Sequence, residues 1–497
     1  MKIPRLGKAK YNIITTLLNQ LITTACGIII PHILISSFGS ETYGITVSIT
    51  QFLSYITLLE GGIGGVARAR LYGPLARKDN SEISAVYNAV KRFFQYVAIA
   101  FVIYSAVLGL VYHDIAHVSI FSRAYIFALV IVISLSTLAK YMGGLANLTL
   151  IVADQRQYIN NLITAATTVA NTIAIIVLVN MKTDIIWVKL GSSLIFIVRP
   201  LLYSLYVKKH YVLPKTEKGK AVLDQKWTGI GQHIAYFLHT NTDVVLLTLF
   251  ANARLIAVYS VYHLVINSIR AITEAFSGGM EAAFGEMIAK GQLAKLQRSY
   301  GRYKALLTSV SVVMFCCTGV LIVPFIKLYT KGITDADYTQ PLFALIMLLA
   351  EAVNCMILPC ASLPVAANRL KQTRWGAYGE AIINIALSCI LIQWDPLLGV
   401  AIGTLAATVF RGVFYMFYSS KHLLHMPFYK LILRFVGTIA VLLSLILLGR
   451  FLLQYVTIEN YFQWILCGAA VFAAVGIPAA LYLVIRSKTS GPECEAE

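Results

Sequence analysis

Long uncharged apolar runs dominate this sequence. Residues 95–112 read QYVAIAFVIYSAVLGLVY, residues 124–139 read AYIFALVIVISLSTLA, and residues 435–449 read FVGTIAVLLSLILLG. An α-helix needs about 20 mostly apolar residues to cross the hydrocarbon core of a bilayer. The chain is 58% hydrophobic and only 13% charged, whereas about 25% of a typical soluble domain is charged. These runs predict an all-α polytopic membrane protein.

The hydropathy pattern predicts about fourteen membrane-spanning helices. The chain begins with the basic sequence MKIPRLGKAK and continues into a long first span without a small-residue cleavage site, so we expect no cleavable signal. The predicted spans are 11–37, 42–68, 88–112, 122–152, 158–180, 184–207, 228–250, 254–287, 302–328, 340–367, 375–394, 397–419, 430–453 and 460–485.

Lysine and arginine collect on alternate predicted loops. RARLYGPLARKD, KKHYVLPKTEKGKAVLDQK and KGQLAKLQRSYGRYK fall on one side, and HDIAHV, TKGITDAD and QWDP fall on the other. Because cytoplasmic loops carry the excess of Lys and Arg, this pattern predicts a cytoplasmic-membrane protein with both termini in the cytoplasm. Topology and attraction to anionic lipid headgroups account for the net charge of +19. We therefore expect no nucleic-acid partner.

The two halves of the chain resemble each other weakly. Tyr43 aligns with Tyr259 at an offset of 259 − 43 = 216, and Asn171 aligns with Asn384 at 384 − 171 = 213. Chance similarity between apolar helices is the alternative. Since spans 1–6 and 7–12 begin on the same side, we expect two six-helix lobes related by a parallel pseudo-two-fold axis along the membrane normal. The predicted organisation is an N-terminal lobe at 1–207, a cytoplasmic linker at 208–227, a C-terminal lobe at 228–420, and two extra helices with a cytoplasmic tail at 421–497.

Polar residues recur along the predicted span 254–287 at spacings of three and four, which keeps them on one helix face. The set is Tyr259, His263, Asn267, Arg270, Glu274, Ser277, Gly278, Glu281 and Gly285. A charge at the bilayer centre costs about 2.5–3.5 kcal/mol on insertion scales, so we expect this face to line a polar lumen. Arg270 and Glu274 are four residues apart and can form an ion pair. A purely structural ion pair is the alternative, but it leaves the other polar groups unexplained.

Three further spans have polar faces, and we predict a central cavity lined by spans 1, 2, 7 and 8. The polar residues are Asn12, Thr16, Asn19 and Thr23 in span 1; Tyr43, Thr46, Thr50, Ser54, Thr57, Gly61, Gly64 and Arg68 in span 2, with Glu60 beside them; and Gln232, Tyr236, His239 and Asp243 in span 7.

Single charges interrupt other spans, at Lys140, Arg199, Glu351, Glu380 and Arg411. Lys140 and Arg411 lie near mid-span, where either can contact an anionic substrate. Snorkelling or pairing with a carboxylate such as Glu351 is the alternative. Spans 13 and 14 carry charges only near their ends, which suits packing or a surface for a lipid tail.

Several functions are not expected. The sequence has no Walker motif, and no predicted outer loop is long enough for a catalytic domain. Its eight cysteines are scattered without metal-ligand spacing. HDIAHV is too short and isolated for a metal site. We therefore expect a protein that is not an enzyme and binds no metal or cofactor, apart from a coupling Na⁺ or H⁺.

A distinctive segment runs from the end of the first predicted span to the start of the third. It reads IPHILISSFGSETYGITVSITQFLSYITLLEGGIGGVARARLYGPLARKDNSEISAVYNAVKRFF. Its Gly-x-x-x-Tyr-Gly turn (Gly39 to Gly44), its Glu-Gly step with a glycine cluster, and its PLARKD loop resemble the Wzx-type polysaccharide exporters of the MATE-like flippase superfamily. The resemblance is strong over the first 95 residues and diffuse beyond them.

The resemblance implies a two-lobed, V-shaped bundle that works by alternating access. Its substrate would be an oligosaccharide on a polyprenyl diphosphate, flipped for cell-surface polysaccharide biosynthesis. Membrane lipids, and glycosyltransferases or a polymerase of the same pathway, would be partners. The alternatives are a MATE-type cation/drug antiporter, a peptidoglycan-precursor flippase and a scaffold without transport activity.

An anionic diphosphate and a hydrated glycan need cations and polar groups, whereas ion coupling needs groups that alternate between charged and neutral forms. Glycines weaken a helix, and Gly61-x-x-x-Gly65 permits close helix approach. The candidate substrate-binding residues are Arg270, Asn267, His263, Lys140, Arg411, Thr57 and Asn19; the ion-coupling candidates are Glu60, Glu274, Asp243 and His239; and the gate candidates are Gly61, Gly64, Gly65 and Glu281.

Overall fold

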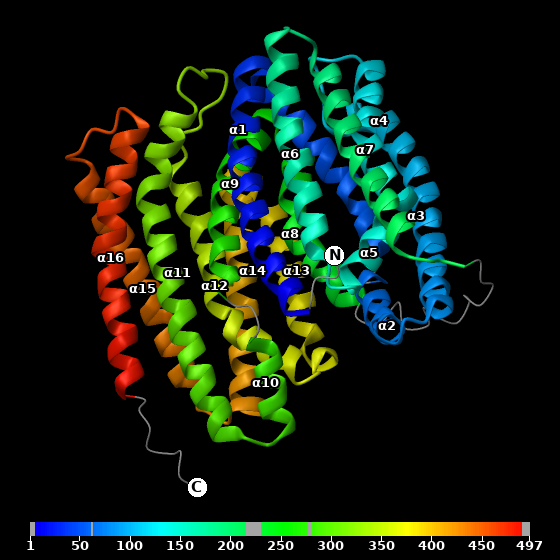
Figure 1. Cartoon of the computed structure of the whole chain (residues 1–497). Helices are drawn as coiled ribbons and strands as arrows, with labels where there is room; N and C mark the ends of the chain where they lie inside the picture. The colour runs from blue at the N-terminus through cyan, green and yellow to red at the C-terminus, as the bar shows by residue number, and fades with distance from the viewer. Residues whose placement is uncertain (1–4, 61–62, 215–229, 277–279, 490–497) are drawn as a thin grey trace. The chain divides into compact units, whose positions relative to one another are not determined.

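The computed structural model describes residues 5–60, 63–214, 230–276 and 280–489, and every regular element in these ranges is helical (Figure 1). Among the described residues, eleven helices are long and apolar enough to cross a membrane, and the first of them, Tyr11–Glu60, covers the predicted span 11–37 and most of the predicted span 42–68. Two further predicted spans fall on α8 (Ile230–Phe250) and α13 (Leu370–Leu391). The prediction of an all-α polytopic membrane protein is confirmed.

The chain divides into two compact units. Unit 1 comprises Met1–Phe237 and Asn252–Ala257, and unit 2 comprises Leu238–Ala251 and Val258–Glu497. Helices α8 and α9 (Ala253–Ala275) each contribute residues to both units. The limits predicted for the lobes and the linker, and the axis relating the lobes, stay predictions.

In unit 1, α1 packs on α6, while α4 contacts both α3 and α7. Apolar side chains from several helices of this unit form one core that includes Phe94, Phe101, Leu129 and Leu150. The elements are α1 (Arg5–Ser54), η1 (Tyr55–Glu60), α2 (Ile63–Arg77), α3 (Asn80–Ile115), α4 (Arg123–Ala139), η2 (Lys140–Gly144), α5 (Leu145–Ala153), α6 (Gln157–Asn180) and α7 (Ile185–His210).

In unit 2, α14 packs against α12 and α13, and α11 packs against α12, α15 and α16 (Figure 1). The last two helices therefore attach to one side of α11. The elements are α10 (Met280–Ala289), α11 (Leu293–Tyr329), α12 (Pro341–Ala366), α13, α14 (Pro396–Ser419), η3 (Ser420–Leu424), α15 (Phe428–Leu453) and α16 (Tyr461–Thr489).

Two structural requirements explain the glycines at the two ends of the motif from Gly39 to Gly44. Gly39 has φ 82° and ψ 162°, a backbone conformation that glycine adopts far more readily than other residues, and α1 turns there. Gly44 lies against the start of α9 within unit 1, where an added Cβ would be 1.8 Å from the carbonyl oxygen of Ala253. Glu41 and Arg254 form an ion pair beside this contact, with 3.0 Å between Oε2 and Nη2. The first glycine makes the turn and the second permits the close approach.

The predicted spans 42–68 and 254–287 are wrong as single α-helices. Within the described residues, α1 ends at Ser54 and is followed by the 3-10 helix η1, and α9 ends at Ala275. Each predicted span also contains a Gly pair, and glycine in a helix interior costs about 1 kcal/mol relative to alanine. The two Gly pairs, which include Gly61, lie outside the described residues. The polar set of span 254–287 is therefore divided between α9 and α10.

The close helix approach predicted at Gly65 stays a prediction. An added Cβ at Gly64 or Gly65 would meet no atom of the described residues within 4 Å. Packing among the described residues therefore does not require glycine at these two positions. A role in bending stays a prediction.

Gly64→Leu should reduce transport while leaving membrane insertion normal. The open space accepts the side chain, and leucine stiffens the start of α2 because it has a higher helix propensity than glycine. Gly73→Leu, within the same helix, is the matched control. Export is measured for each variant together with the amount of protein in the membrane. Unchanged export by Gly64→Leu would exclude a bending role for Gly64.

Candidate functional site

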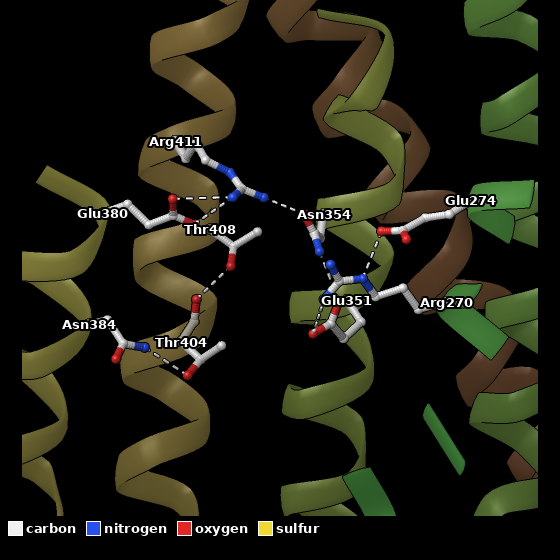
Figure 2. A network of polar contacts seen from close by, with 9 residues as sticks. All are labelled: Arg270, Glu274, Glu351, Asn354, Glu380, Asn384, Thr404, Thr408 and Arg411. Atoms are coloured by element: carbon white, nitrogen blue, oxygen red, sulfur yellow. Dashed lines mark hydrogen bonds and ion pairs between the residues drawn. The ribbon is translucent and has the colours of Figure 1, made fainter. Parts of the chain in front are cut away.

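A chain of ion pairs and hydrogen bonds crosses unit 2 on helices α9, α12, α13 and α14 (Figure 2). On α9, Arg270 Nε donates to Glu274 Oε1 at 2.8 Å, which confirms the predicted ion pair. Arg270 Nη1 also lies 3.3 Å from Oε2 of Glu351 on α12. The side chains of Arg270 and Glu351 are each 14% exposed, against 36% for Glu274. Glu274 is therefore the accessible end of this network.

The same network continues to Arg411 on α14. Its Nη1 lies 3.1 Å from Glu380 Oε1 on α13, and its Nη2 donates to Asn354 Oδ1. Asn354 in turn donates through Nδ2 to Glu351 Oε2 at 3.0 Å. Asn354 thus connects the surroundings of the two arginines. Of the two interpretations of Arg411, the structure favours pairing with carboxylates, because Glu380 already contacts it.

The charges of the network do not balance. Two guanidinium groups face three carboxylates, those of Glu274, Glu351 and Glu380. A buried charge is stable only when it is paired and hydrogen-bonded. Counting these five groups alone and with all of them ionised, the network has one negative charge in excess. A network with an excess carboxylate can accept a proton or a small cation.

A second cluster surrounds Asp243 on α8. This carboxylate is 7% exposed, accepts a hydrogen bond from Tyr259 at 2.9 Å, and lies 3.1 Å from Thr404 Oγ1. Asn384 Nδ2 donates to Thr404 Oγ1 at 2.8 Å. The other amide atom, Asn384 Oδ1, is buried without a hydrogen-bond partner among the described residues. A carboxylate with amide and hydroxyl oxygens beside it fits a proton or Na⁺.

Helix α14 carries residues of both clusters. Thr408 donates to the Thr404 carbonyl oxygen at 2.8 Å, and Arg411 follows three residues later. Thr404 and Arg411 are seven residues apart, so they lie on one face of the helix about 10 Å from each other along its axis. Figure 2 shows Thr404, Thr408 and Arg411 along this helix.

In unit 1, Glu60 ends η1 and faces the η2 turn. Tyr141 donates to Glu60 Oε1 at 2.5 Å, and Lys140 Nζ lies 3.6 Å from the same oxygen. Both partners come from one π-helical turn between α4 and α5, a feature often found at functional sites. Lys140 is therefore paired with a carboxylate, as the alternative interpretation expects.

The remaining α9 candidates have different surroundings. His263 stacks on Tyr259 with 5.5 Å between ring centroids, whereas Asn267 is exposed. In the next helix, Glu281 is exposed in the first turn of α10.

Other candidates lie in α1, η1, α7 and α8. Thr57 in η1 donates to the Ser54 carbonyl oxygen at 2.8 Å. Asn19 in α1 has a buried Oδ1 without a hydrogen-bond partner among the described residues. Arg199 in α7 donates hydrogen bonds to hydroxyl oxygens, from Nε to Thr167 at 2.6 Å and from Nη2 to Thr168 at 3.0 Å. The backbone of His239 is in α8, and its side chain lies outside the described part of the chain.

Asn354, Asn384 and Thr404 complete the clusters but were not among the candidate site residues. Isolated amides and hydroxyls in apolar helices usually bond neighbouring helices, so single polar residues outside a polar stripe are weak candidates unless they are charged. Spacing could have identified two of them. Asn354 follows Glu351 by three residues on α12, and Thr404 precedes Arg411 by seven on α14.

No protein-family model and no curated protein matches the sequence. Solved structures do match. The lipid II flippase MurJ, in an inward closed conformation, aligns with TM-score 0.68 and 13% identity over 95% of this chain and 99% of MurJ. The MATE multidrug transporter DinF-BH gives TM-score 0.61 and 14% identity over 86% of this chain and 97% of that one. The eukaryotic MATE transporter AtDTX14 gives 0.58 and 12%, over 89% and 99%.

Because these identities are low, the likeness establishes the fold and nothing beyond it. It agrees with the eleven apolar helices found in the part of the chain that the structure describes. This protein is a polytopic membrane protein with the fold shared by the lipid II flippase MurJ and the MATE transporters.

Proposed function

We propose that this protein flips a polyprenyl-diphosphate-linked oligosaccharide from the cytoplasmic to the outer face of the cytoplasmic membrane, by ion-coupled alternating access. The guanidinium of Arg270 carries the proposal, because it lies on a membrane helix with the exposed Asn267 and the accessible Glu274 beside it. The exporter-like first 95 residues and the MurJ-like fold support it. Both termini would be cytoplasmic, and enzymes of cell-surface polysaccharide biosynthesis would supply and consume the substrate.

The surroundings of Arg270 suggest how substrate and ion are coupled. A diphosphate offers arginine the same bidentate oxygen contacts that Glu274 and Glu351 now provide. When the diphosphate takes their place, the released carboxylate loses its cationic partner. Desolvation then favours a protonated or cation-bound form. Substrate and coupling ion would therefore favour each other's binding.

Asp243 is the ion site that we propose, with Thr404 and Asn384 as further oxygen ligands. The buried and unpartnered Asn384 Oδ1 fits a cation, while the Tyr259 and Thr404 hydroxyls suit a carboxylate that gains and loses a proton. Transport measurements under separate Na⁺ and pH gradients distinguish the two ions.

A groove in unit 2 suits the lipid tail. It has a volume of about 920 Å³ and is lined by α11, α15 and α16, mainly by apolar side chains such as Val312 and Leu445. Lys304 and Arg434 contribute basic groups to the same groove. We propose that the polyprenyl chain lies along it while the polar head crosses.

The decisive experiment is reconstitution of the full chain in proteoliposomes with a labelled lipid-linked oligosaccharide. We expect translocation that depends on an ion gradient. The carboxylate excess of the unit 2 network favours a second function, cation or drug antiport. Uptake of cationic dyes without translocation of the oligosaccharide would establish that second function and overturn the first.

A cysteine in place of Asn267 should react with a membrane-impermeant thiol reagent, and one in place of Leu445 should not. Asn267 is exposed on the polar side of α9, whereas Leu445 lines the apolar groove. Labelling in a variant without native cysteines tests this prediction. The reverse pattern would contradict the assignment of α9 to the water-filled path.

A further inference from the structure

A second groove lies on unit 1, beside the η2 turn that carries the partners of Glu60. It has a volume of about 530 Å³ and lies between α3 and the end of α4 with η2. The side chains that line the groove near the start of the α3 stretch are polar, and those that line the rest of it are apolar. The lining residues are Arg92, Gln95, Tyr96, Ala98, Ile99, Val102, Leu138 and Met142.

The polar end of the groove coincides with a membrane boundary. Residues 93–112 of α3 contain no charged side chain, and about 20 such residues cross the hydrocarbon core. Arg92 directly precedes this stretch. Tyr96 is 71% exposed, and tyrosine is typical of the interface between headgroups and hydrocarbon. The groove therefore begins at headgroup level and continues along α3 to the depth of the hydrocarbon.

Arg92 is available for a ligand at this boundary. It is exposed and has no ion pair or hydrogen bond with any other side chain or backbone group in the described ranges. Gln95, three residues later on the same face, adds an amide donor. Along α3, the apolar part from Arg92 to Val102 covers about 15 Å. The exposed side chains of Ile99, Val102 and Met142 line it.

We infer that this groove binds an anionic phospholipid from the leaflet on the Arg92 side. The phosphate contacts the Arg92 guanidinium and the Gln95 amide, and one acyl chain lies against Ile99, Val102 and Met142. An exposed arginine without a carboxylate partner complements a phosphate, and the apolar lining complements the chain.

The occupant would support the η2 turn. Met142 belongs to the same π-helical turn as Lys140 and Tyr141, which hold Glu60. A chain packed against Met142 would limit movement of this turn. The lipid is therefore a structural ligand of unit 1, distinct from the proposed substrate.

Native mass spectrometry of the purified full chain tests the inference. After delipidation, phosphatidylglycerol and phosphatidylcholine with identical acyl chains are titrated separately. We expect one phosphatidylglycerol to bind more tightly than any phosphatidylcholine, and Arg92→Gln to weaken that binding about tenfold, as expected for loss of one charge-assisted hydrogen bond. Lys91→Gln is the matched control, since Lys91 does not line the groove. Val102→Trp should weaken the binding by filling the apolar part.

Three results would overturn the inference. Equal losses in Arg92→Gln and Lys91→Gln would indicate general electrostatic attraction, and equal binding of the two lipids would indicate no headgroup recognition. Displacement of phosphatidylglycerol by polyprenyl phosphate at equal concentration would assign the groove to the substrate. Thermal unfolding of each variant checks that the fold is retained. Because only binding is measured, the result is independent of whether the protein transports an oligosaccharide.

Discussion

Arg270→Ala should abolish export of the lipid-linked oligosaccharide while the protein still inserts into the membrane. The substitution removes the cation that we propose for the diphosphate, together with its contacts to Glu274 and Glu351. Arginine donates in a planar fork, so Arg270→Lys should restore export only in part. Proteoliposome translocation and cellular polysaccharide export are the measurements.

A double variant separates loss of function from loss of stability. Removing one partner of a buried ion pair typically costs about 3–5 kcal/mol, because the other charge is left unpaired. Arg270→Ala combined with Glu351→Gln removes both charges and should fold better than Arg270→Ala alone. Export should still be lost. Normal export by this double variant would exclude Arg270 from substrate binding.

Arg254→Ala is the matched control for loss of an arginine. Arg254 also pairs with a carboxylate, Glu41, but its side chain is 55% exposed. Exposed ion pairs contribute about 0–1 kcal/mol. We expect near-normal export, so a complete loss in both single variants would indicate a general effect of losing an arginine.

Asp243→Asn should remove the dependence of transport on an ion gradient and slow transport at least about tenfold under a gradient, which corresponds to about 1.4 kcal/mol. Asparagine keeps the side-chain shape and one oxygen that accepts the Tyr259 hydrogen bond, but it cannot ionise. The measurement is translocation under imposed Na⁺ and pH gradients, each compared with no gradient.

Asp395→Asn provides the control for this substitution. Asp395 caps α14 by accepting a hydrogen bond from the Leu398 backbone N–H, and asparagine caps helices about as well as aspartate. Transport by Asp395→Asn should stay ion-dependent. Full gradient dependence in Asp243→Asn would move the ion site elsewhere, with Glu60 and Glu274 as the next carboxylates to test.

The predictions for Arg270 and for Asp243 both involve α14, since Thr404 contacts Asp243 and Arg411 contacts Asn354. A helix is stiff over two turns, so a shift at Thr404 moves Arg411 as well. We expect ion binding at Asp243 to alter the network around Arg270 in this way. Substrate affinity measured with and without the ion, in wild type and in Thr404→Val, would reveal this coupling.

Fold class was predictable because it depends on local properties. In hydrocarbon each backbone N–H and C=O must be bonded within the protein, so a long uncharged run becomes a helix wherever it occurs. The same reasoning located α3 and α15 without knowledge of their neighbours. It failed at residues 42–68 and 254–287, where apolar composition hid the ends of α1 and α9.

The site was predictable only in part. Helical spacing identified the Arg270–Glu274 pair because both residues belong to one helix. Glu351 is 81 residues from Arg270, and its place beside that arginine depends on how α12 packs against α9. Periodicity shows which face of a helix is polar, but it carries no information about which helix that face meets.

The membrane class, the helical architecture and the polar character of individual helices therefore follow from the amino-acid sequence alone. Each of these depends on local composition and on the solvent. The partners depend on tertiary packing: Glu60 with Lys140 and Tyr141, Arg411 with Glu380, and Asp243 with Thr404. Partner choice is a property of packing between distant segments, because an ionised group in hydrocarbon is stabilised by whichever opposite charge or hydrogen-bonding group the packing places beside it.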